Sequence, residues 1–432
     1  MNTYGLILAG GKGTRMNDSL PKVAQKILGK EFINYVYDAL DLAGIEKIYP
    51  IVGYKRDIVL ACRDFENYFV QEKQLGTGHA VQMAYENLYD KEGLCVVIAG
   101  DQPLITSESL KELIRVHKKN ENHLTLLTAI SPDPYGYGRI VRDGNEVIKI
   151  VEEKDATEKE KLIDEVNIST FCFDNKLLFK FIKELRNENK QKELYLTDVL
   201  SIFKREHLKV EAVSALTYEE TIGISDKSDL EKATTFLRTK INQKHMINGV
   251  SIIDSSNTYI GPDVNIGSGT IIYPGSVLEG KVTIGENCLI QASYIYDSSL
   301  GNNVTVGPFA HIRQNCVLGN DIRIGNFVEI KKSTLDDGVK SAHLTYLGDS
   351  EIAKNVNIGC GTITVNYDGK NKHKTIIEEG AFIGSNANLI APITIGKNSK
   401  IAAGSTITKD VPNDSLAIAR ERETIKKDYY KK

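Results

Sequence analysis

A glycine-rich segment near the start of the chain has the composition of a phosphate-binding loop. Residues 8–16 read Leu-Ala-Gly-Gly-Lys-Gly-Thr-Arg-Met and follow a short apolar run. Glycines let backbone N–H groups approach a phosphate, and the cations Arg15 and Lys22 can neutralise its charge. The loop is neither a dinucleotide-binding fingerprint nor a Walker loop, because Met16 stands where the fingerprint needs its third glycine. A plain turn is the alternative for a glycine loop taken by itself.

Polar residues further along the chain strengthen the case for a nucleotide and a divalent cation. Gln71 and the run that follows it as far as Gly78 offer amide and backbone groups that can read the edge of a base. Asp101 follows an apolar run, and a carboxylate there can hold Mg²⁺ while substrate phosphates complete the coordination shell. The polar residues at 137–139 and 151–154 are expected near a second ligand.

A histidine in the second half of the chain is the candidate for acid–base chemistry. His343 opens the segment His-Leu-Thr-Tyr-Leu-Gly-Asp, in a stretch rich in Lys, His, Asn and Tyr. An imidazole near its usual pKa can accept or donate a proton in general acid–base catalysis. A structural role is the ordinary interpretation of a lone histidine, and we keep that interpretation for His245, His311 and His373.

The elements that must position the first group of residues alternate between strand and helix over residues 1–225. Apolar runs predict buried strands and amphipathic runs predict helices between them, which favours an α/β Rossmann-like domain with a mostly parallel sheet. Strands are expected at 4–8, 48–52, 94–99 and 124–130, and helices at 32–43, 78–88 and 107–119. Ligands bind at the carboxyl ends of such strands, which indicates residues 9–15 and 100–101. A linker helix is expected over 226–246.

The hydrophobic period changes to six residues over the remaining part of the chain, 247–432. Neither an α-helix nor an alternating strand produces this period, whereas each side of a parallel β-helix coil places one aliphatic residue in a common core. The residues that follow the period are Ile260, Ile266, Ile272, Leu278, Ile284, Ile290, Leu300, Val306, Ile312, Leu318, Ile324, Ile330, Ile383, Leu389, Ile395, Ile401 and Ile407. The period breaks at 331–351 and 367–382, where we expect loops inserted between the coils.

The bulk properties exclude several classes of protein. A chain of 432 residues exceeds what one hydrophobic core usually holds. The formal net charge of −3 gives no reason to expect nucleic acid or an anionic membrane as a partner. No apolar run is long enough to span a bilayer, and the first residues do not resemble a signal peptide. The six cysteines form no C-x-x-C pair, which favours reduced thiols in the cytoplasm.

Together these segments resemble the bacterial bifunctional N-acetylglucosamine-1-phosphate uridylyltransferase/glucosamine-1-phosphate acetyltransferase family over nearly the whole chain. The resemblance implies acetyl transfer from acetyl-CoA to glucosamine 1-phosphate. It then implies uridylyl transfer from UTP to N-acetylglucosamine 1-phosphate, with release of pyrophosphate, in the synthesis of a cell-wall peptidoglycan precursor. It further implies Mg²⁺, a left-handed β-helix and a homotrimer.

The resemblance assigns residues to the uridylyl-transfer site one by one. Arg15 and Lys22 are implied as catalytic, and Asp101 and Ser225 as the ligands of Mg²⁺. The residues implied to meet the nucleotide and the sugar are Leu8, Ala9, Gly10, Gly11, Lys22, Gln71, Gly76, Thr77, Ala99, Gly100, Asp101, Gly138, Glu152, Asn167 and Ser225. The chain departs from the family where Ser225 replaces an asparagine, with Asp226 as a neighbouring substitute. It departs again at 167–169, where Asn-Ile-Ser replaces Asn-Thr-Gly.

The resemblance assigns a second set of residues to acetyl transfer, in a site that lies between subunits of the trimer. His343 is implied as the base, with Glu329 orienting it and Lys372 near the reacting groups. Cys360 replaces an alanine of the family at a position where only the backbone is expected to contact the ligand. The residues implied for the acceptor are Arg313, Lys331, Tyr346 and Asn357, and those for acetyl-CoA are Cys360, Asn366, Tyr367, Ser385, Ala403 and Arg420.

Two other functions fit parts of these patterns. One is a single-activity sugar-1-phosphate nucleotidylyltransferase whose β-helix is structural or regulatory. The presence of Arg313, Lys331 and His343 argues against this function, because a structural β-helix does not require them. The other is a catalytically silent interaction or exchange-factor subunit, which would have no use for Lys22 and Asp101.

Overall fold

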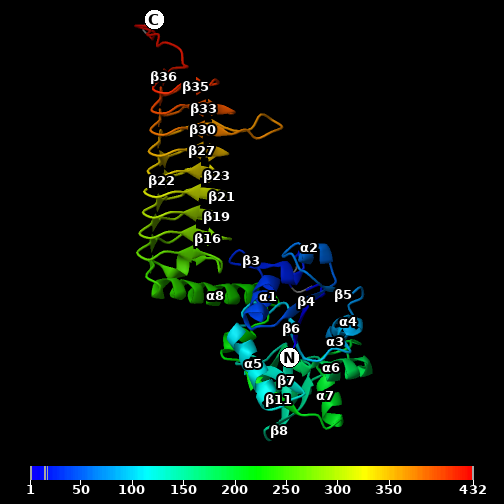
Figure 1. Ribbon diagram of the computed structural model, residues 1–432. Coiled ribbons are helices and arrows are strands. Elements are labelled where there is room, and N and C mark those ends of the chain that lie inside the picture. Colours follow the sequence, from blue (N-terminus) through cyan, green and yellow to red (C-terminus); the bar gives the residue numbers. More distant parts are fainter. Residues whose placement is uncertain (1, 14–15, 17, 431–432) are drawn as a thin grey trace. The chain divides into compact units, whose positions relative to one another are not determined.

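The computed structural model describes residues 2–13, 16 and 18–430, and the chain divides into two compact units, Met1–Leu237 and Arg238–Lys432. The first unit holds an α/β sheet and the second a stack of coils (Figure 1). Among the described residues, no helix combines the length and the apolar character needed to cross a membrane.

The first unit is built on a mixed sheet with strand order β11-β7-β10-β6-β1-β4-β5. The pairs of β1 with β4 and β6, of β4 with β5, and of β7 with β11 are parallel, whereas β10 runs antiparallel to β6 and β7. The strands are β1 (Thr3–Ala9), β4 (Lys47–Val52), β5 (Phe69–Val70), β6 (Leu94–Ala99), β7 (Leu124–Ile130), β10 (Glu165–Asp174) and β11 (Val210–Ser214), with the hairpin β8 (Gly138–Asp143) and β9 (Glu146–Val151) paired to β10 and a small ribbon of β2 (Lys26–Ile27) and β3 (Lys30–Glu31). The α/β prediction is confirmed.

Helices cover both faces of this sheet. They do so because successive residues of its central strands point to opposite faces, and the residues on both faces are apolar. On β1, Leu6 belongs to one buried cluster and Ile7 to the other. The cluster around Ile7 includes residues of α1 (Phe32–Leu42), α2 (Arg56–Leu60) and α5 (Ser107–Lys119). The cluster around Leu6 includes residues of α3 (Thr77–Gln82), α4 (Tyr85–Leu88), α6 (Asn175–Phe181) and α7 (Asp198–Arg205). The single helix expected over 78–88 is therefore two short helices.

A long helix, α8 (Lys227–Ile247), follows the first sheet where a linker helix is expected. Its start is capped by Asp226, whose Oδ1 accepts the backbone N–H groups of Ser228 and Asp229 at 2.8 and 3.0 Å. The division between the two compact units falls within this helix.

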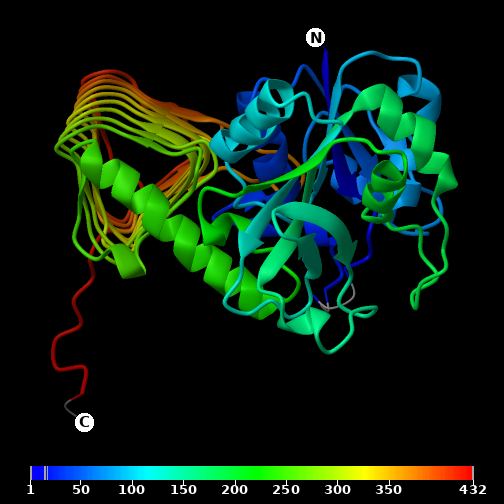
Figure 2. The same ribbon diagram turned by 90° about the horizontal axis from the view of Figure 1, so that it is seen from below.

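The second unit is a parallel β-helix, seen along its axis as a three-sided coil in Figure 2. Successive coils pair in register, as in the row Ile272, Ile290, Val306 and Ile324. All the residues that follow the six-residue period are buried in one cluster except Ile266, which packs against it partly buried. The strands are β12 (Ser251–Ile252), β13 (Tyr259–Ile260), β14 (Asn265–Ile266), β15 (Ile271–Ile272), β16 (Val277–Glu279), β17 (Thr283–Ile284), β18 (Leu289–Ile290), β19 (Tyr294–Leu300), β20 (Thr305–Val306), β21 (His311–Leu318), β22 (Arg323–Asn326), β23 (Glu329–Lys331), β24 (Thr334–Leu335), β25 (Lys340–His343), β26 (Tyr346–Gly348), β27 (Ser350–Ile352), β28 (Asn357–Ile358), β29 (Ile363–Val365), β30 (Thr375–Ile377), β31 (Phe382–Ile383), β32 (Asn388–Ile390), β33 (Ile393–Ile395), β34 (Lys400–Ile401), β35 (Thr406–Ile407) and β36 (Leu416–Ala417).

Only one of the two expected loop insertions leaves the coil. Residues 331–351 continue it through β24, β25 and β26. The six-residue period is lost there because Leu335 follows Ile330 after only five residues, and because the buried Ser341 takes the inward position that pairs with Ile324. Between β29 and β30 the chain does leave the coil, and this loop projects beside β30 in Figure 1. The prediction of an inserted loop at 331–351 is wrong, and the second loop ends where β30 begins, before the expected 382.

Candidate active sites

The glycine loop and Asp101 meet at one edge of the first sheet because the strands that precede them are parallel neighbours. Leu8 of β1 pairs with Ala99 of β6, and the N–H of Gly100 donates to the carbonyl of Leu8 at 3.0 Å. The turns after both strands therefore open on the same side, as the sequence predicts for an α/β ligand site.

Lys22 and Asp101 form an ion pair at this edge. Lys22 Nζ contacts Asp101 Oδ2, and the side chains are 14% and 27% exposed. The pair brings a cation next to a carboxylate within reach of solvent. Such an arrangement can bind a phosphate and a divalent cation together, because each charge offsets the other until the ligand arrives.

Gln71 lies behind the glycine loop and ties it to the segment before α3. Its Nε2 donates to the carbonyl of Gly76 at 3.0 Å, and only 4% of the residue is exposed. A Cβ placed on Gly10 would lie 2.7 Å from Gln71 Oε1, so Gly10 has no room for a side chain. Gly76 has φ of +111° and packs against the backbone of Leu194, which explains why glycine is needed there too.

A cavity of about 440 Å³ joins these features. Of the residues expected at the nucleotide, it is lined by Leu8, Gly10, Gly11, Lys22, Gln71, Gly76, Thr77, Ala99 and Asp101. Ala9 and Gly100 are their chain neighbours, and Arg15 lies outside the described residues. Further lining comes from Lys12, Gly13, Val23, Gln74, Ala80, Ser169 and Glu193. Sequence reasoning missed Glu193 because it reaches the cavity only through backbone pairing of Leu194 with Leu75.

The three residues expected at the amino sugar lie together beside this cavity. Asn167 pairs with Gly138 across β10 and β8, and a Cβ on Gly138 would lie 3.5 Å from both carboxylate oxygens of Glu152. Asn167 Oδ1 accepts the N–H of Ser169, which lines the cavity. Burial raises the pKa of Glu152 above its ordinary value, while a hydrogen bond from Thr197 Oγ1 at 3.0 Å opposes the shift.

Ser225 is positioned next to Asp101 through the backbone. The N–H of Ile224 donates to the carbonyl of Asp101 at 3.1 Å, and the N–H of Ser225 donates to Asp229 Oδ2 at 2.9 Å. Asp226, the suggested substitute ligand, instead caps α8. The carboxylate of Asp101 and the hydroxyl of Ser225 are hard oxygen donors of the kind that suit Mg²⁺.

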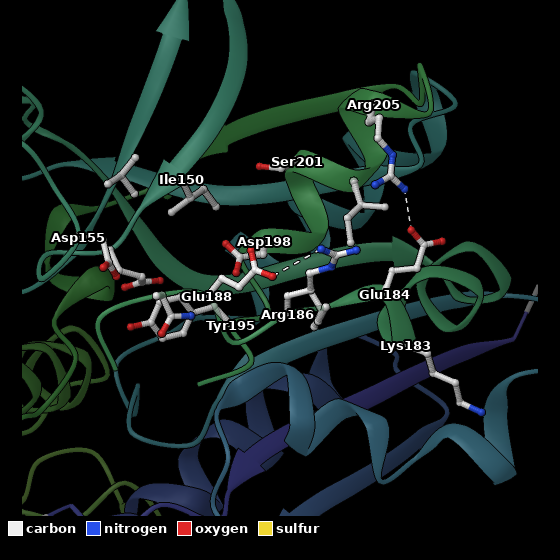
Figure 3. Close-up of a pocket in the computed structure, with 15 residues that line it drawn as sticks. Ile150, Asp155, Lys183, Glu184, Arg186, Glu188, Tyr195, Asp198, Ser201 and Arg205 are labelled. Atoms are coloured by element: carbon white, nitrogen blue, oxygen red, sulfur yellow. Dashed lines mark hydrogen bonds and ion pairs between the residues drawn. The ribbon is translucent and has the colours of Figure 1, made fainter. Parts of the chain in front are cut away.

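A second cavity of the first unit, of about 740 Å³, is lined by different residues (Figure 3). Glu152 also lines it, but the glycine loop does not. Its two arginines are already paired, Arg205 with Glu184 at 2.6 Å and Arg186 with Glu188 at 3.5 Å, and Lys183 Nζ lies 3.3 Å from the ring centre of Tyr85. The loop, the cation and the carboxylate converge on the smaller cavity instead, which is where the sequence predicts the nucleotide.

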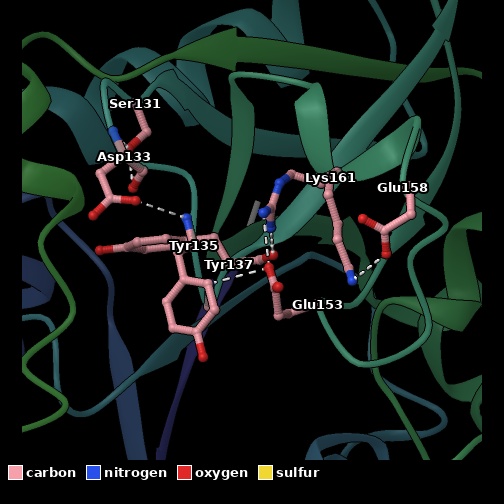
Figure 4. Close-up of polar contacts among 9 residues, drawn as sticks. Ser131, Asp133, Tyr135, Tyr137, Glu153, Glu158 and Lys161 are labelled. Atoms are coloured by element: carbon pink, nitrogen blue, oxygen red, sulfur yellow. Dashed lines mark hydrogen bonds and ion pairs between the residues drawn. The ribbon is translucent and has the colours of Figure 1, made fainter.

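A buried ion pair holds the loop that precedes β8 (Figure 4). Arg139, with 2% of its side chain exposed, donates to Glu153 at 2.7 Å and to the carbonyl of Tyr137. Glu153 also accepts the N–H of Gly136 at 3.1 Å. These two charged residues, expected near a second ligand, support the fold around Gly138.

In the second unit, residues expected at acetyl-CoA follow His343 along one edge of the coils. Pairing of β22, β25, β28, β31 and β34 places Asn326, His343, Cys360, Ser385 and Ala403 on successive rungs. Backbone hydrogen bonds also link neighbouring rungs of this row: the N–H of Asn386 donates to the carbonyl of Cys360, and the N–H of Gly404 donates to the carbonyl of Ser385. The row ends near Arg420, whose Cδ approaches Gly404. Most of these side chains, including His343, are exposed in the single chain.

Two cations expected at the sugar phosphate lie on neighbouring rungs. Arg313 of β21 pairs in register with Lys331 of β23. Arg313 Nη1 donates to Glu329 at 3.0 Å, and Glu329 is in register with Tyr346. The arrangement provides two adjacent positive charges, which is what a phosphate dianion requires.

Tyr346, Asn366 and Gly348 form a compact group at the base of the projecting loop. Asn366 Nδ2 lies 3.5 Å from the Tyr346 hydroxyl and also donates to Asp349. A Cβ on Gly348 would lie 2.5 Å from that hydroxyl. In the loop itself, Lys372 Nζ lies 4.4 Å from the ring centre of Tyr367. Asn357 lies on β28, which pairs with the strand of His343.

Fold and sites together define a transferase that joins a nucleotidyl-transfer unit to a hexapeptide-repeat unit. Residues 4–223 match the nucleotidyl transferase family, residues 241–335 the GMPPB C-terminal domain, and residues 374–409 six repeats of the bacterial transferase hexapeptide. The chain is 49% identical to the bifunctional protein GlmU of Geobacillus sp. (strain WCH70), over 99% of this chain and 97% of that protein. The GlmU proteins of Bacillus subtilis (strain 168) and Clostridioides difficile (strain 630) are 47% and 46% identical, over 99% and 100% of this chain and 98% of each relative.

The chain belongs to the bifunctional GlmU family, as the resemblance predicts. It is a multifunctional transferase with nucleotidyltransferase and acetyltransferase activities.

Proposed function

We propose that the chain makes UDP-N-acetylglucosamine in two steps at two separate sites. Acetyl-CoA first acetylates glucosamine 1-phosphate on the β-helix, and UTP then reacts with N-acetylglucosamine 1-phosphate in the first unit. The observation that supports this most strongly is the row from His343 to Ala403, because it aligns a base with a straight edge along which a pantetheine arm can extend.

In the uridylyl step, a phosphate oxygen of the sugar phosphate attacks the α-phosphorus of UTP. A new P–O bond forms, and the bond to the leaving pyrophosphate breaks. The reaction needs no protein nucleophile, so positioning and charge neutralisation supply the catalysis. Lys22, together with Arg15, would contact the phosphates, Gln71 and Thr77 the base, and Glu152 with Asn167 the sugar.

Mg²⁺ is the cation that these donors suit. The Asp101 carboxylate is partly exposed at the cavity, and Ser225 is held beside its backbone. No group of three or more His, Cys, Asp or Glu side chains suited to a metal occurs among the described residues. Asp101 and Ser225 would therefore hold the ion with substrate phosphates completing its shell, and the bound ion would neutralise phosphate charge.

In the acetyl step, the amine of glucosamine 1-phosphate attacks the thioester carbonyl. A C–N bond forms, the C–S bond breaks, and coenzyme A leaves as its thiol. His343 would take the proton that the amine loses. Arg313 and Lys331 would bind the sugar phosphate, with Tyr346 and Asn357 at the sugar and Asn366, Tyr367, Ser385, Ala403 and Arg420 at acetyl-CoA.

We further propose that the chain works as a homotrimer in the cytoplasm and supplies peptidoglycan synthesis. The row beginning at His343 is exposed in a single chain, whereas acyl transfer to an amine is favoured in a site that excludes water. A neighbouring subunit would provide that cover.

Reciprocal substitutions test the two-site proposal. His343→Ala should reduce acetylation of glucosamine 1-phosphate by about 10²-fold or more and leave uridylyl transfer intact. Asp101→Ala should abolish Mg²⁺-dependent pyrophosphate release and leave coenzyme A release intact. Asp90→Ala, an exposed carboxylate that contacts only its neighbour Lys91 among the ion pairs of the described residues, serves as the control. Loss of both activities in either variant would contradict two independent sites.

A further inference from the structure

We propose that Asn326 is a positioning residue for acetyl transfer: its side-chain carbonyl fixes the His343 imidazole in the tautomer that leaves Nε2 free to accept a proton. The inference rests on the proposed role of His343 as the base and assigns that base a fixed orientation.

The side chains of Asn326 and His343 are in direct contact. His343 Nδ1 lies 2.9 Å from Asn326 Oδ1. Both residues end their strands, β22 and β25, and are paired in register on neighbouring rungs. The N–H of Leu344 donates to the carbonyl of Asn326 at 3.0 Å, so backbone and side chain are both linked across the same step. The contact therefore follows from the rung spacing of the coil.

The backbone around the pair allows little adjustment. A Cβ placed on Gly325 would lie 1.9 Å from the carbonyl oxygen of Ala342, so the neighbouring rung leaves no room for a side chain just before the pair. Phe327 and Leu344, which follow the two residues, both adopt left-handed conformations, with φ of 56° and 44°. The chain thus turns in the same way after Asn326 and after His343. The side chains of these two residues therefore leave the coil in parallel.

The chemistry of the amide determines which imidazole nitrogen carries the proton. An amide oxygen only accepts hydrogen bonds, so Nδ1 must be the donor in this contact, and the lone pair then lies on Nε2. An amide is neutral and does not stabilise the imidazolium as a carboxylate would. Of the two strands paired with β25, β22 carries Arg323 and β28 carries no charged residue, while Lys340 lies on β25 itself. Glu329 lies across the corner and is paired with Arg313.

Two substitutions at position 326 separate positioning from a structural role. Asn326→Ala should lower kcat of acetyl transfer about tenfold or more, because the imidazole loses its fixed tautomer, while KM for both substrates changes little. Asn326→Asp keeps an acceptor oxygen, so it should restore most of kcat. Its carboxylate should also stabilise the imidazolium and move the acidic limb of the pH profile of kcat/KM to higher pH. Uridylyl transfer, measured in the same preparations, reports that the chain is folded.

Asn388→Ala is the matched control, because Asn388 also contacts a side chain on a neighbouring rung, Thr406, at 3.4 Å. Its acetyl transfer should equal that of the wild type. An Asn326→Ala variant with unchanged kcat would overturn the inference, as would an Asn326→Asp variant whose kcat is not restored or whose pH profile does not move. If His343→Ala itself retains acetyl transfer, the proposed function fails; if His343→Ala is inactive and Asn326→Ala is fully active, only the present inference fails.

Discussion

At the scale of single residues, Arg139 and Glu153 show that charges close to a ligand site can serve the fold. Their positions in the sequence, on either side of Gly138 and next to Glu152, suggest a role in ligand binding. In the structure the Arg139 guanidinium is buried, and its Nη1 and Nη2 donate to a backbone carbonyl and to Glu153. Removing one partner of such a pair leaves the other charge buried without compensation.

We therefore expect Glu153→Ala to destabilise the first unit by about 3 kcal/mol, because Arg139 would keep its buried charge without a partner. Glu158→Ala removes an exposed carboxylate paired with Lys161 in the same region and should cause no measurable change (Figure 4). Urea denaturation followed by the helical circular dichroism band would compare the two variants. Equal stability of both would show that the Arg139–Glu153 pair is not a major contribution.

The raised pKa of Glu152 gives the first unit a pH dependence. A carboxyl whose pKa in the folded state exceeds its value of 4.5 in the unfolded state binds protons more tightly when folded, so stability falls as pH rises from 4.5 through the folded-state pKa. Glu152→Gln removes the ionisation and should raise the melting temperature at neutral pH more than at pH about 4. Glu188→Gln, at an exposed position, is the control. A Glu152→Gln effect that is the same at both pH values would contradict this assignment.

The residue types in the sequence predicted part of the nucleotide site. The remaining residues that line the cavity are brought there by contacts between segments far apart in the sequence. Asp101 and the glycine loop could be placed together because parallel strands end at a common edge. Glu193 could not, because its segment reaches the cavity through the backbone pairing of Leu194 with the distant Leu75. That long-range pairing leaves no local pattern in the sequence.

At the scale of elements, the six-residue period predicted the coil well wherever inward positions are aliphatic. It failed at 331–351 because the step from Ile330 to Leu335 is one residue short and Ser341 takes the next inward position, although backbone pairing to neighbouring rungs still holds this coil. A strict six-residue period cannot follow a coil that changes its spacing or places a small polar residue inward. The first sheet shows a similar limit: apolar runs located the strands β6 and β7 but not the antiparallel β10 between them.

A substitution at Gly348 would test how closely the coil fixes the positions of Tyr346 and Asn366. Gly348→Ala places a Cβ 2.5 Å from the Tyr346 hydroxyl and 2.6 Å from Asn366 Nδ2, so both side chains must move. We expect acetyl transfer to fall about tenfold or more, because a displacement of about 1 Å in a positioned group can cost that much. Uridylyl transfer should not change. The measurement is the rate of coenzyme A release, and an unaffected rate would mean that neither side chain contributes at its present position.

At the scale of the whole molecule, the two units each carry a complete core of their own and a separate set of site residues. The buried clusters of the sheet and of the coil share no residue. The cavity beside the glycine loop is lined by residues of the first unit, whereas His343 and most of the residues in its row are exposed. Self-association should therefore matter for one activity and be dispensable for the other.

An exposed apolar ladder beside His343 allows this difference to be tested. Phe309 and Phe327 lie on neighbouring rungs with ring centres 5.5 Å apart, and they are 60% and 55% exposed; Leu344, on the next rung, is 58% exposed. Apolar groups stacked in this way on a surface favour contact with another protein surface. Replacing Phe309 and Phe327 together by Asp should convert the proposed trimer to monomers in sedimentation experiments and abolish acetyl transfer, while uridylyl transfer continues. Leu162→Asp, at an exposed apolar position of the first unit, should change neither property. Trimers that persist in the double variant, or monomers that retain full acetyl transfer, would show that the ladder does not close the site.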